Sequence, residues 1–435
     1  MTRFQILIIF SLSIIFLGSF DLEANGQVFE KYNVEVVTIA ENLQIPWQIA
    51  FAPDGRIFFT ERVGALRVIE DGILNPEPVA TFDVGAGEGG LLGLALDPKF
   101  DQNHFLYLYY TYFEFPYTYN KVLRYTENNN TLSDELVLVD KIPGGLVHDG
   151  GRLKFGPDQK LYITTGDAGN AGSAQDLNSL AGKILRINSD GSIPPDNPFS
   201  DSMVFSYGHR NPQGLDWEPI TGKLVEAEHG PTGERGFAHD EINIIEAGKN
   251  YGWPKFIGGE EHSIGFVSPI IHSGDDTWAP SGATFYDSFN IPEWTDKYFV
   301  AMLRGNQLRM FDFDIENNQV KSSEVLFLDA FGRLRDASMG PGGNLYLLTS
   351  NRDGRGSPAE NDDRILKIIP NVFKEKIMGD SSFSPLKQIM QGVLPIDVAC
   401  KTGYELIIKS NTLQPACVKS SSAEKLVSKG WGVWP

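Results

Sequence analysis

The chain has 435 residues, of which 56 are acidic and 37 basic, so its formal net charge at neutral pH is −19. A surface this acidic repels phosphate backbones, which argues against nucleic acid as a partner. With 45 glycines, 25 prolines and 11% aromatic residues, the composition indicates many short strands joined by tight turns.

Residues 1–24 are predicted to be an export signal. A weakly positive start, Thr2-Arg3, precedes the apolar run FQILIIFSLSIIFLGSF, and small residues near Gly18 or Ala24 offer cleavage sites. The alternative is an uncleaved membrane anchor, because a run of ~17 apolar residues is close to spanning length. Both readings place the bulk of the chain outside the cytoplasm, in an extracellular, periplasmic or cell-surface location.

Residues 33–371 are predicted to form an all-β, six-bladed β-propeller. A short apolar strand, a Pro/Asp/Gly turn and a second, alternating strand recur along this region, which is a hairpin pattern, and a further strand often follows. The copies lie at residues 49–61, 94–112, 153–167, 215–230, 278–305 and 337–350. Six units of about 55 residues indicate six blades, whereas a β-sandwich does not explain so regular a period.

The pattern changes after Pro370. Residues 372–383 are predicted to be a linker and residues 384–435 a small C-terminal module with a hairpin and a short final helix. The two cysteines, Cys400 and Cys417, are expected to form a disulfide because the chain is exported; two buried free thiols are the alternative. Closing this loop would stabilise the module by roughly 3 kcal/mol. The module carries no catalytic constellation, so we expect a surface or attachment role.

His148 is the first candidate for chemistry. Loops between propeller blades meet at the mouth of the central channel, and His148 lies in such a loop, GGLVHDGG, with Asp167 at the end of the following hairpin. A neutral imidazole can take up a proton near pH 7, and a carboxylate on its other nitrogen would fix its tautomer. A turn histidine that bonds only to the backbone is the alternative.

The second candidate is the motif GHRNPQGL. Arg210, Asn211 and Gln213 bring a fixed cation and two amides together, and the proline between them stiffens the turn. Such a cluster suits an anionic or carbonyl-rich ligand. The alternative is a turn whose polar side chains satisfy backbone carbonyls.

The third candidate is a set of arginines. Arg333 and Arg335 stand two residues apart and therefore share one face of a strand, and Arg304 occupies a similar place one blade earlier. Together they indicate a ligand with several carboxylates or phosphates. Alternating surface ion pairs are the competing interpretation.

Two loops hold candidate oxygen ligands. Gly230 and Pro231 could expose consecutive carbonyl oxygens, and the nearby Asp240 and Glu241 could supply carboxylates, a combination that suits Ca²⁺. Glu88, in a glycine-rich loop, is either a site residue or a turn carboxylate.

Taken in order, several motifs resemble those of the soluble quinoprotein sugar dehydrogenases that use pyrroloquinoline quinone (PQQ), in particular the aldose sugar dehydrogenases. The resemblance covers roughly residues 36–370 and rests on GEGGLLGLALDP, HDGGRLKFGPDQKLYITTGD, GHRNPQGL, EHGP, DEINIIEAGKNYGWP, APSG and GRLRDA. That family is a six-bladed propeller, in agreement with the repeats. The resemblance implies that the chain oxidises the anomeric hydroxyl of an aldose to a lactone, with hydride transfer to PQQ and onward electron transfer to an external acceptor.

The resemblance also implies residue roles. His148 would be the general base and would also contact the cofactor, and Asp167 would orient it beside the sugar. Arg210 and Asn211 would contact the quinone oxygens, where the Arg210 cation stabilises developing charge. Gln213 belongs to the same motif.

The remaining implied contacts concern cofactor and metal. Arg333 and Arg335 would bind PQQ, whose three carboxylates explain the arginine set, and Thr277 would make a polar contact to it. The carbonyls of Gly230 and Pro231 would hold Ca²⁺.

The chain departs from the pattern of the glucose dehydrogenase in three respects. Glu88 stands where that enzyme has a glutamine near the substrate, and Arg304, a further cofactor contact, stands where it has a lysine. The loops associated with the dimeric enzyme are short here, which favours a monomer with a broad aldose preference. Two other functions compete. A Ca²⁺-dependent lactonase would have no use for the arginines, and a ligand-binding propeller without catalysis would tolerate loss of His148 or Arg210.

Overall fold

The computed structural model describes residues 27–85, 87–231, 238–258, 265–371, 379–391, 393–410 and 414–435. The predicted export signal, residues 1–24, and most of the predicted linker lie outside these residues. Within them, no helix is long and apolar enough to cross a membrane.

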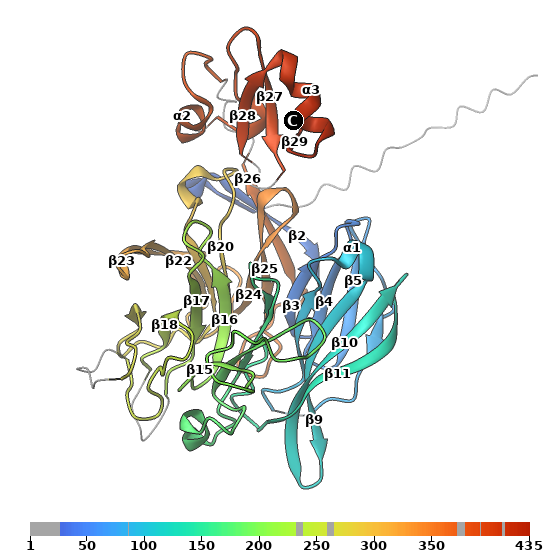
Figure 1. Ribbon diagram of the computed structural model, residues 1–435, viewed down its shortest axis with the longest axis vertical. Coiled ribbons are helices and arrows are strands. Elements are labelled where there is room, and N and C mark those ends of the chain that lie inside the picture. Colours follow the sequence, from blue (N-terminus) through green and yellow to red (C-terminus); the bar gives the residue numbers. More distant parts are fainter. Residues whose placement is uncertain are drawn as a thin grey trace, which may run out of the picture.

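Six antiparallel sheets form the body of the molecule and confirm the predicted all-β propeller (Figure 1). Blade 1 contains β3 (Pro46–Phe51), β4 (Ile57–Glu61), β5 (Ala65–Glu70), β6 (Ile73–Leu74) and β7 (Ala80–Thr81). Blade 2 contains β8 (Leu91–Leu96), β9 (Phe105–Glu114), β10 (Tyr117–Asn128) and β11 (Thr131–Pro143). Blade 3 contains β12 (Leu153–Phe155), β13 (Leu161–Thr165), β14 (Lys183–Ile187) and β15 (Val204–Tyr207).

Blades 4 and 5 follow the same order from the inside outward. Blade 4 contains β16 (Pro212–Trp217), β17 (Leu224–Glu228), β18 (Glu241–Ile245) and β19 (Ile271–His272). Blade 5 contains β20 (Pro280–Phe285), β21 (Tyr298–Met302), β22 (Gln307–Asp314) and β23 (Gln319–Leu326).

Blade 6 closes the ring with strands from both ends of the propeller. It contains β24 (Leu334–Gly340), β25 (Asn344–Thr349), β26 (Ile365–Pro370), β2 (Val34–Ala40) and β1 (Gln27–Phe29). β2 pairs antiparallel with β26, with Val34 opposite Pro370 and Ala40 opposite Ile365. A strand from the start of the propeller therefore pairs with a strand from its end within blade 6, and this pairing closes the ring.

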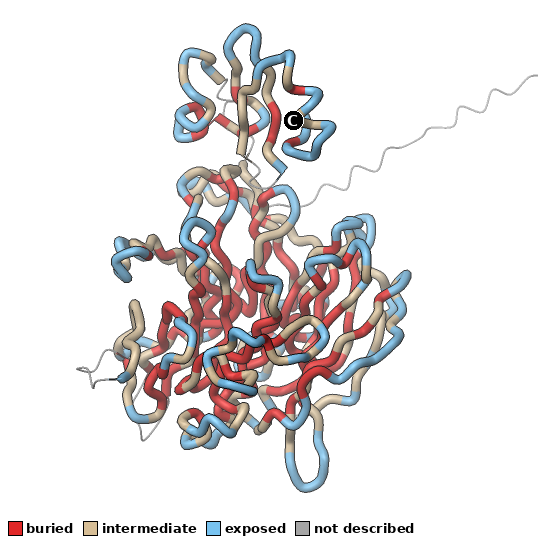
Figure 2. Tube along the Cα trace, in the orientation of Figure 1, coloured by how far each residue is buried: buried red, intermediate tan, exposed pale blue. Residues whose placement is uncertain are grey.

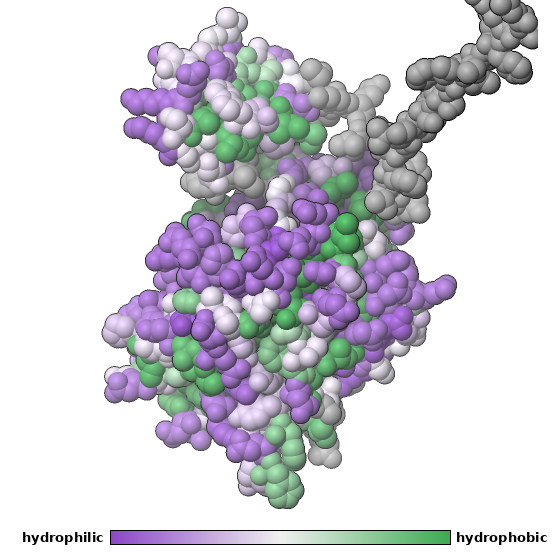
Figure 3. Space-filling view, turned by 90° about the vertical axis from the view of Figure 1, so that its right-hand side faces the viewer, coloured by the Kyte–Doolittle hydropathy of each residue, from purple (hydrophilic) through white to green (hydrophobic). Residues whose placement is uncertain are grey.

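The core consists of apolar clusters within and between neighbouring blades, seen as the buried interior in Figure 2. Trp47, Tyr107 and Trp294 are among its largest side chains, each at most 1% exposed. The face shown in Figure 3 carries many hydrophilic side chains with hydrophobic ones between them. The β9–β10 hairpin carries the exposed Phe113 and Phe115 at its tip.

A buried ion pair lines one of the two cavities that border the inner strands. Nη1 of Arg152 lies 3.0 Å from Oδ1 of Asp336, and both side chains are buried. Gly282 explains how they fit: a Cβ at this position would lie 1.7 Å from Oδ1 of Asp336 and 2.7 Å from Nη2 of Arg152. Two cavities border the inner strands, one where these strands begin and one where they end, and the ion pair lines the second.

The C-terminal module lies beyond one end of the propeller (Figure 1). It contains α2 (Pro385–Met390), α3 (Ser420–Ser428), β27 (Tyr404–Lys409), β28 (Pro415–Lys419) and β29 (Gly432–Val433). A disulfide joins Cys400 to Cys417 with their Cα atoms 5.5 Å apart, and a small apolar cluster around Ile389 contacts Phe289 of the propeller. The domain boundaries themselves remain a prediction.

The other helices of the described chain are short. They are α1 (Phe100–Asn103) and the 3₁₀ turns Glu30–Tyr32, Ala171–Gln175, Pro292–Trp294, Pro341–Gly343 and Pro395–Asp397. The two cavities are lined by the inner strands and the loops that join them.

Candidate active site

A cavity of about 490 Å³ opens where the inner strands begin, and we call it the site cavity. It is lined by six arginines from loops of four blades: Arg62, Arg210, Arg304, Arg333, Arg335 and Arg355. The predicted site residues Glu88, His148, Gln213, Gly230 and Thr277 also line it. Asp167 and Asn211 lie directly behind it, each bonded to the loop that carries His148, and Pro231 lines a small adjoining space.

His148 and Asp167 form the expected pair. Nδ1 of His148 lies 2.7 Å from Oδ1 of Asp167. The backbone of His148 has a left-handed φ of 61°, which turns the ring toward the cavity. Gly166 permits the approach of the two loops, because a Cβ there would lie 1.9 Å from the carbonyl oxygen of His148.

The charge of Asp167 determines which tautomer His148 adopts. Burial alone would raise the pKa of Asp167, but the hydrogen bond and charge of His148 outweigh it and hold that pKa below its ordinary value. An ionised carboxylate only accepts hydrogen bonds, so Nδ1 of His148 carries the proton. In the neutral imidazole the lone pair is then on Nε2, and this is the form that a general base requires.

Arg333 and Arg335 are both buried and differ in how they are compensated. Arg333 donates from Nε and Nη2 to Oδ2 of Asp353 at 3.0 and 2.8 Å. Arg335 donates to Oε1 of Gln213 at 3.0 Å, while its Nε has no partner among the described residues. Burial, with the neighbouring Arg62 cation, lowers the pKa of Arg335 to about 9. Its nearest carboxylate oxygen, Oδ2 of Asp353, lies 3.8 Å from Nη2 and is shared with Arg333, so this buried cation is suited to receive a further anionic group.

Arg210 and Asn211 come from the turn that enters β16. Arg210 donates to the carbonyl of His229 at 3.2 Å, and its guanidinium lies 5.5 Å from the centre of the Trp253 ring. Oδ1 of Asn211 accepts the backbone N–H of Gly150 at 3.1 Å, which ties this turn to the His148 loop. Nδ2 of Asn211 is buried and has no partner among the described residues, so it can donate to a ligand.

Glu88 contacts the loop that carries His148. Its Oε2 accepts the backbone N–H of His148 at 3.0 Å, and its Oε1 lies 2.7 Å from Arg355. Burial favours the neutral form of Glu88, but the His148 N–H and the charges of His229 and Arg355 lower its pKa. Glu88 is therefore an anion at the rim of the site cavity.

The acidic residues near Gly230 and Pro231 are occupied by protein groups. Oδ1 of Asp240 accepts the N–H of Gly230 at 2.8 Å, and its Oδ2 accepts N–H groups of Trp278 and Ala279. Glu241 accepts the N–H of Gly258 at 2.8 Å. Asp240 thus shapes the turn that presents Gly230, and the expectation that these two carboxylates are metal ligands has no support in their hydrogen bonds.

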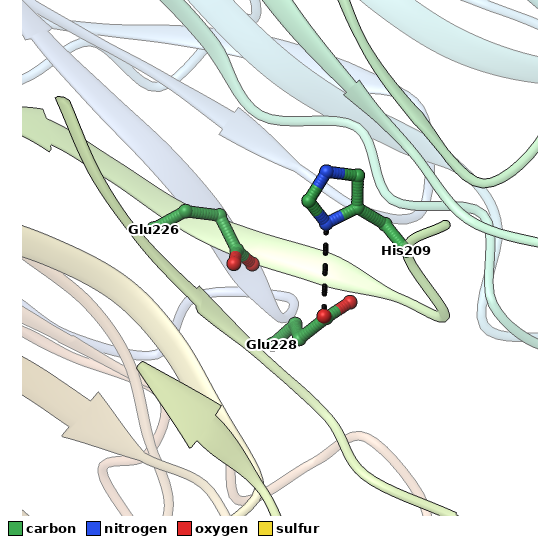
Figure 4. Close-up of side chains that lie close together, drawn as sticks. All are labelled: His209, Glu226 and Glu228. Carbon is green, nitrogen blue, oxygen red and sulfur yellow. Dashed lines mark ion pairs between the residues drawn. The ribbon is translucent and has the colours of Figure 1, made fainter. Parts of the chain in front are cut away.

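A second cluster of titratable side chains, His209, Glu226 and Glu228, is next to Arg210 in the chain and on β17, and Figure 4 shows the three side chains close together. His209, Glu226 and Glu228 are all buried, and their ligand atoms lie within 4.8 Å of one another. Nδ1 of His209 lies 3.6 Å from Oε1 of Glu228, whose Oε2 accepts the backbone N–H of Arg210 at 2.9 Å. Burial and the Glu228 charge raise the pKa of Glu226 well above its ordinary value. This group fixes the backbone of Arg210.

Several residues of the site were missed by the sequence analysis. Asp353 bridges the two arginines of GRLRDA, Arg62 and Arg355 add cations, and Trp253 and His229 enclose Arg210. The sequence could have indicated Glu226 and Glu228, because these residues stand two positions apart on the strand β17 and therefore share one face of it. None existed for Trp253, whose contact with Asp167 joins residues 86 positions apart.

The chemistry of the cavity fits PQQ. A volume of about 490 Å³ is within the range of cofactor sites, which runs from roughly 300 to 1,000 Å³. The cations outnumber the acidic residues that line the cavity, and Nε of Arg335 and Nδ2 of Asn211 are donors without partners among the described residues. A flat ligand with three carboxylates and two quinone oxygens matches such a donor set.

Comparison with known proteins agrees with this geometry. The family model described as glucose/sorbosone dehydrogenase matches residues 43–366. The chain belongs to this family. This sugar dehydrogenase is 34% identical over 368 residues to the aldose sugar dehydrogenase YliI of Escherichia coli K12, covering 78% of this chain and 93% of the relative.

Two further relatives connect the family to the cofactor. The chain is 36% identical over 318 residues to quinoprotein glucose dehydrogenase B of Acinetobacter calcoaceticus, covering 62% of this chain and 64% of that one. It superposes on the PQQ-bound aldose sugar dehydrogenase of Streptomyces coelicolor with a TM-score of 0.69 and 33% identity, over 80% of this chain and 98% of the other.

Proposed function

We propose that the chain is a PQQ-dependent aldose dehydrogenase that converts the anomeric hydroxyl of a sugar to a lactone and passes the electrons to an external acceptor. The observation that carries this proposal is the His148–Asp167 pair, which opens onto a cavity lined by six arginines. Membership of the glucose/sorbosone dehydrogenase family supports it.

His148 would take the proton from the anomeric hydroxyl at Nε2, because its Nδ1 is held by Asp167. The resulting imidazolium would be stabilised by the buried Asp167 carboxylate 2.7 Å away. Glu88, on the N–H of His148, would orient the loop and contact the sugar. PQQ, when bound, supplies the hydride acceptor.

The remaining residues would bind and polarise the cofactor. Arg333 and Arg335 would pair with its carboxylates, and Arg304, Gln213 and Thr277 would add contacts from neighbouring loops of the same cavity. Arg210 and Asn211, which share one turn and are tied to the His148 loop, would face the quinone oxygens.

Ca²⁺ is proposed as the second cofactor, held by the carbonyl oxygens of Gly230 and Pro231. Gly230 lines both the site cavity and the small adjoining space, Pro231 lines only the adjoining space, and Asp240 accepts the N–H of Gly230. A hard cation prefers such oxygen ligands. We also propose that the chain is exported and acts as a monomer.

Reconstitution tests the proposal. Purified apoprotein is mixed with PQQ and Ca²⁺, and dye reduction is followed with glucose, with other aldoses and without sugar. We expect sugar-dependent dye reduction that is lost when a chelator removes Ca²⁺. An absence of dye reduction with every aldose, together with no spectral change of the quinone on mixing, would contradict an enzymatic role and favour a ligand-binding propeller.

A further inference from the structure

The second oxygen of the Asp167 carboxylate has a partner of its own. Oδ1 accepts hydrogen bonds from Nδ1 of His148 at 2.7 Å and from the N–H of Gly169 at 2.8 Å. Oδ2 accepts from the indole Nε1 of Trp253 at 2.8 Å. Trp253 follows β18 of blade 4, whereas Asp167 follows β13 of blade 3, so this bond crosses between two blades.

We propose that Trp253 is the positioning residue for the base, and this inference rests on the proposed function. Its N–H holds Oδ2, which leaves Oδ1 directed at the imidazole and prevents the carboxylate from rotating. A tryptophan N–H only donates, so the bond has a single polarity. His148 is thereby kept in the one tautomer that presents a lone pair to the substrate.

Trp253 is itself rigidly held. Its backbone N–H donates to the carbonyl of Gly208 at 2.9 Å, and its carbonyl accepts Nε2 of Gln175 at 2.6 Å. Gln175 is fixed in turn by two bonds to the side chain of Asn250, at 3.0 and 2.8 Å. The indole is 7% exposed, so both its position and its direction are set before any ligand arrives.

A neutral donor at this place has a chemical advantage. The charged or titratable groups that face Asp167 are His148, through Nδ1, and Arg210, whose guanidinium stacks over the Trp253 ring. A lysine or arginine in place of Trp253 would neutralise Asp167 and weaken its support of the imidazolium. The indole N–H satisfies the second oxygen without adding charge, so the carboxylate keeps its full effect on His148.

The test compares Trp253→Phe with Trp217→Phe. The second variant makes the same chemical change at the far end of β16, where Trp217 packs on Tyr162. The first readout is the ¹³C carboxyl titration of Asp167 in the apoprotein. The second is kcat and KM as functions of pH in enzyme loaded with PQQ and Ca²⁺.

We expect Trp253→Phe to raise the pKa of Asp167, to lower kcat about tenfold and to shift the acid limb of the pH profile, while KM changes less than twofold. Trp217→Phe should leave all of these unchanged. If Trp253→Phe fails to fold, benzothienylalanine at position 253 keeps the ring shape without the N–H and must give the same result.

Two results would overturn the inference: an unchanged Asp167 titration and kcat in Trp253→Phe, or equal losses in both variants. If the wild-type protein oxidises no aldose, the proposed function fails, yet the carboxyl titration still decides whether Trp253 holds Asp167.

Discussion

The two ends of the central channel are built from the same six inner strands and differ in their charges. The site cavity, where the strands begin, has a volume of about 490 Å³, and the cavity at the opposite mouth, where they end, has about 830 Å³. At the opposite mouth, Lys154 lies 2.7 Å from Asp216 and Arg152 lies 3.0 Å from Asp336. Glu218 and Asp287 also line the larger cavity, so its acids outnumber its cations, and Nη2 of Arg152 has no hydrogen-bond partner among the described residues.

The site cavity is assembled in the opposite way. Its cations exceed its acids, and buried donors of Arg335 and Asn211 lack partners among the described residues. Such groups reduce the stability of the free protein and are retained where a ligand satisfies them. The two cavities therefore differ in the sign of their charge: arginines predominate in the site cavity, and acidic residues predominate in the larger one.

The largest effect is expected from breaking the buried ion pair between Arg152 and Asp336, which lines the larger cavity. Arg152→Met leaves the buried Asp336 carboxylate uncompensated, and the free energy of unfolding should fall by about 3–5 kcal/mol. Urea denaturation measures the change. The double variant with Asp336→Leu should recover part of the loss, because no lone charge remains. A single variant as stable as the wild type would show that the opposite end does not depend on paired charge.

The second prediction concerns the base at the site end. His148→Ala should lower kcat at least ~10²-fold with PQQ still bound, because it removes a positioned general base. Dye-coupled turnover measures the rate, and the quinone absorbance measures cofactor loading. Lys154→Ala, a charged residue at the opposite mouth, is the control and should keep normal turnover. Full activity of a PQQ-loaded His148→Ala protein would refute the assignment.

The third prediction separates affinity from stability. Arg335→Met should weaken PQQ binding about tenfold or more, because a charge-assisted hydrogen bond contributes roughly 1.5–3 kcal/mol. The apoprotein should be at least as stable as the wild type, because burial already lowers the pKa of Arg335. Titration of apoprotein with PQQ and thermal unfolding without it measure the two effects. Arg335→Lys keeps the charge and should bind PQQ with an intermediate affinity. A destabilised Arg335→Met apoprotein would place this arginine with the paired charges of the opposite end.

The fold could be predicted from the sequence because each blade is a local unit. The hairpin copies at 49–61 and 153–167 became β3–β4 and β12–β13, and the third strands followed at the expected places. The closure of blade 6 by β2 was not visible, because the residues that pair, such as Val34 and Pro370, are separated by nearly the whole propeller. Local patterning predicts strands well and says little about which distant strands pair.

In the candidate site, too, contacts within one local motif could be predicted, and contacts between distant segments could not. The His148–Asp167 pair was predictable because both residues flank one hairpin, and the structure brings them into contact. Asp240 and Glu241 were expected as metal ligands from composition alone, yet their oxygens accept backbone N–H groups. The role of Trp253 depends on a contact between two blades, and no local sequence motif predicts such a contact.

The smallest effect is expected at Asp149, the residue after His148. Its substitution tests whether an unpaired buried carboxyl beside the site cavity lowers the free energy of unfolding. Burial raises the pKa of Asp149 to about 7, and its Oδ2 has no partner among the described residues. The native protein therefore retains a proton that the unfolded chain releases near pH 4, and the free energy of unfolding falls as pH rises from about 4 to about 7.

Asp149→Asn removes this dependence. The amide keeps the acceptor for Asn120 and Gly145 but adds a buried N–H donor, which offsets most of the gain. We expect a melting temperature about 2 °C higher at pH 8, corresponding to roughly 0.5–1 kcal/mol, and no gain at pH 4. Asp336→Asn, at the paired end, should lower the melting temperature at both pH values because Arg152 then loses its counterion. Equal responses of the two variants would mean that the two ends do not differ in how they compensate buried charge.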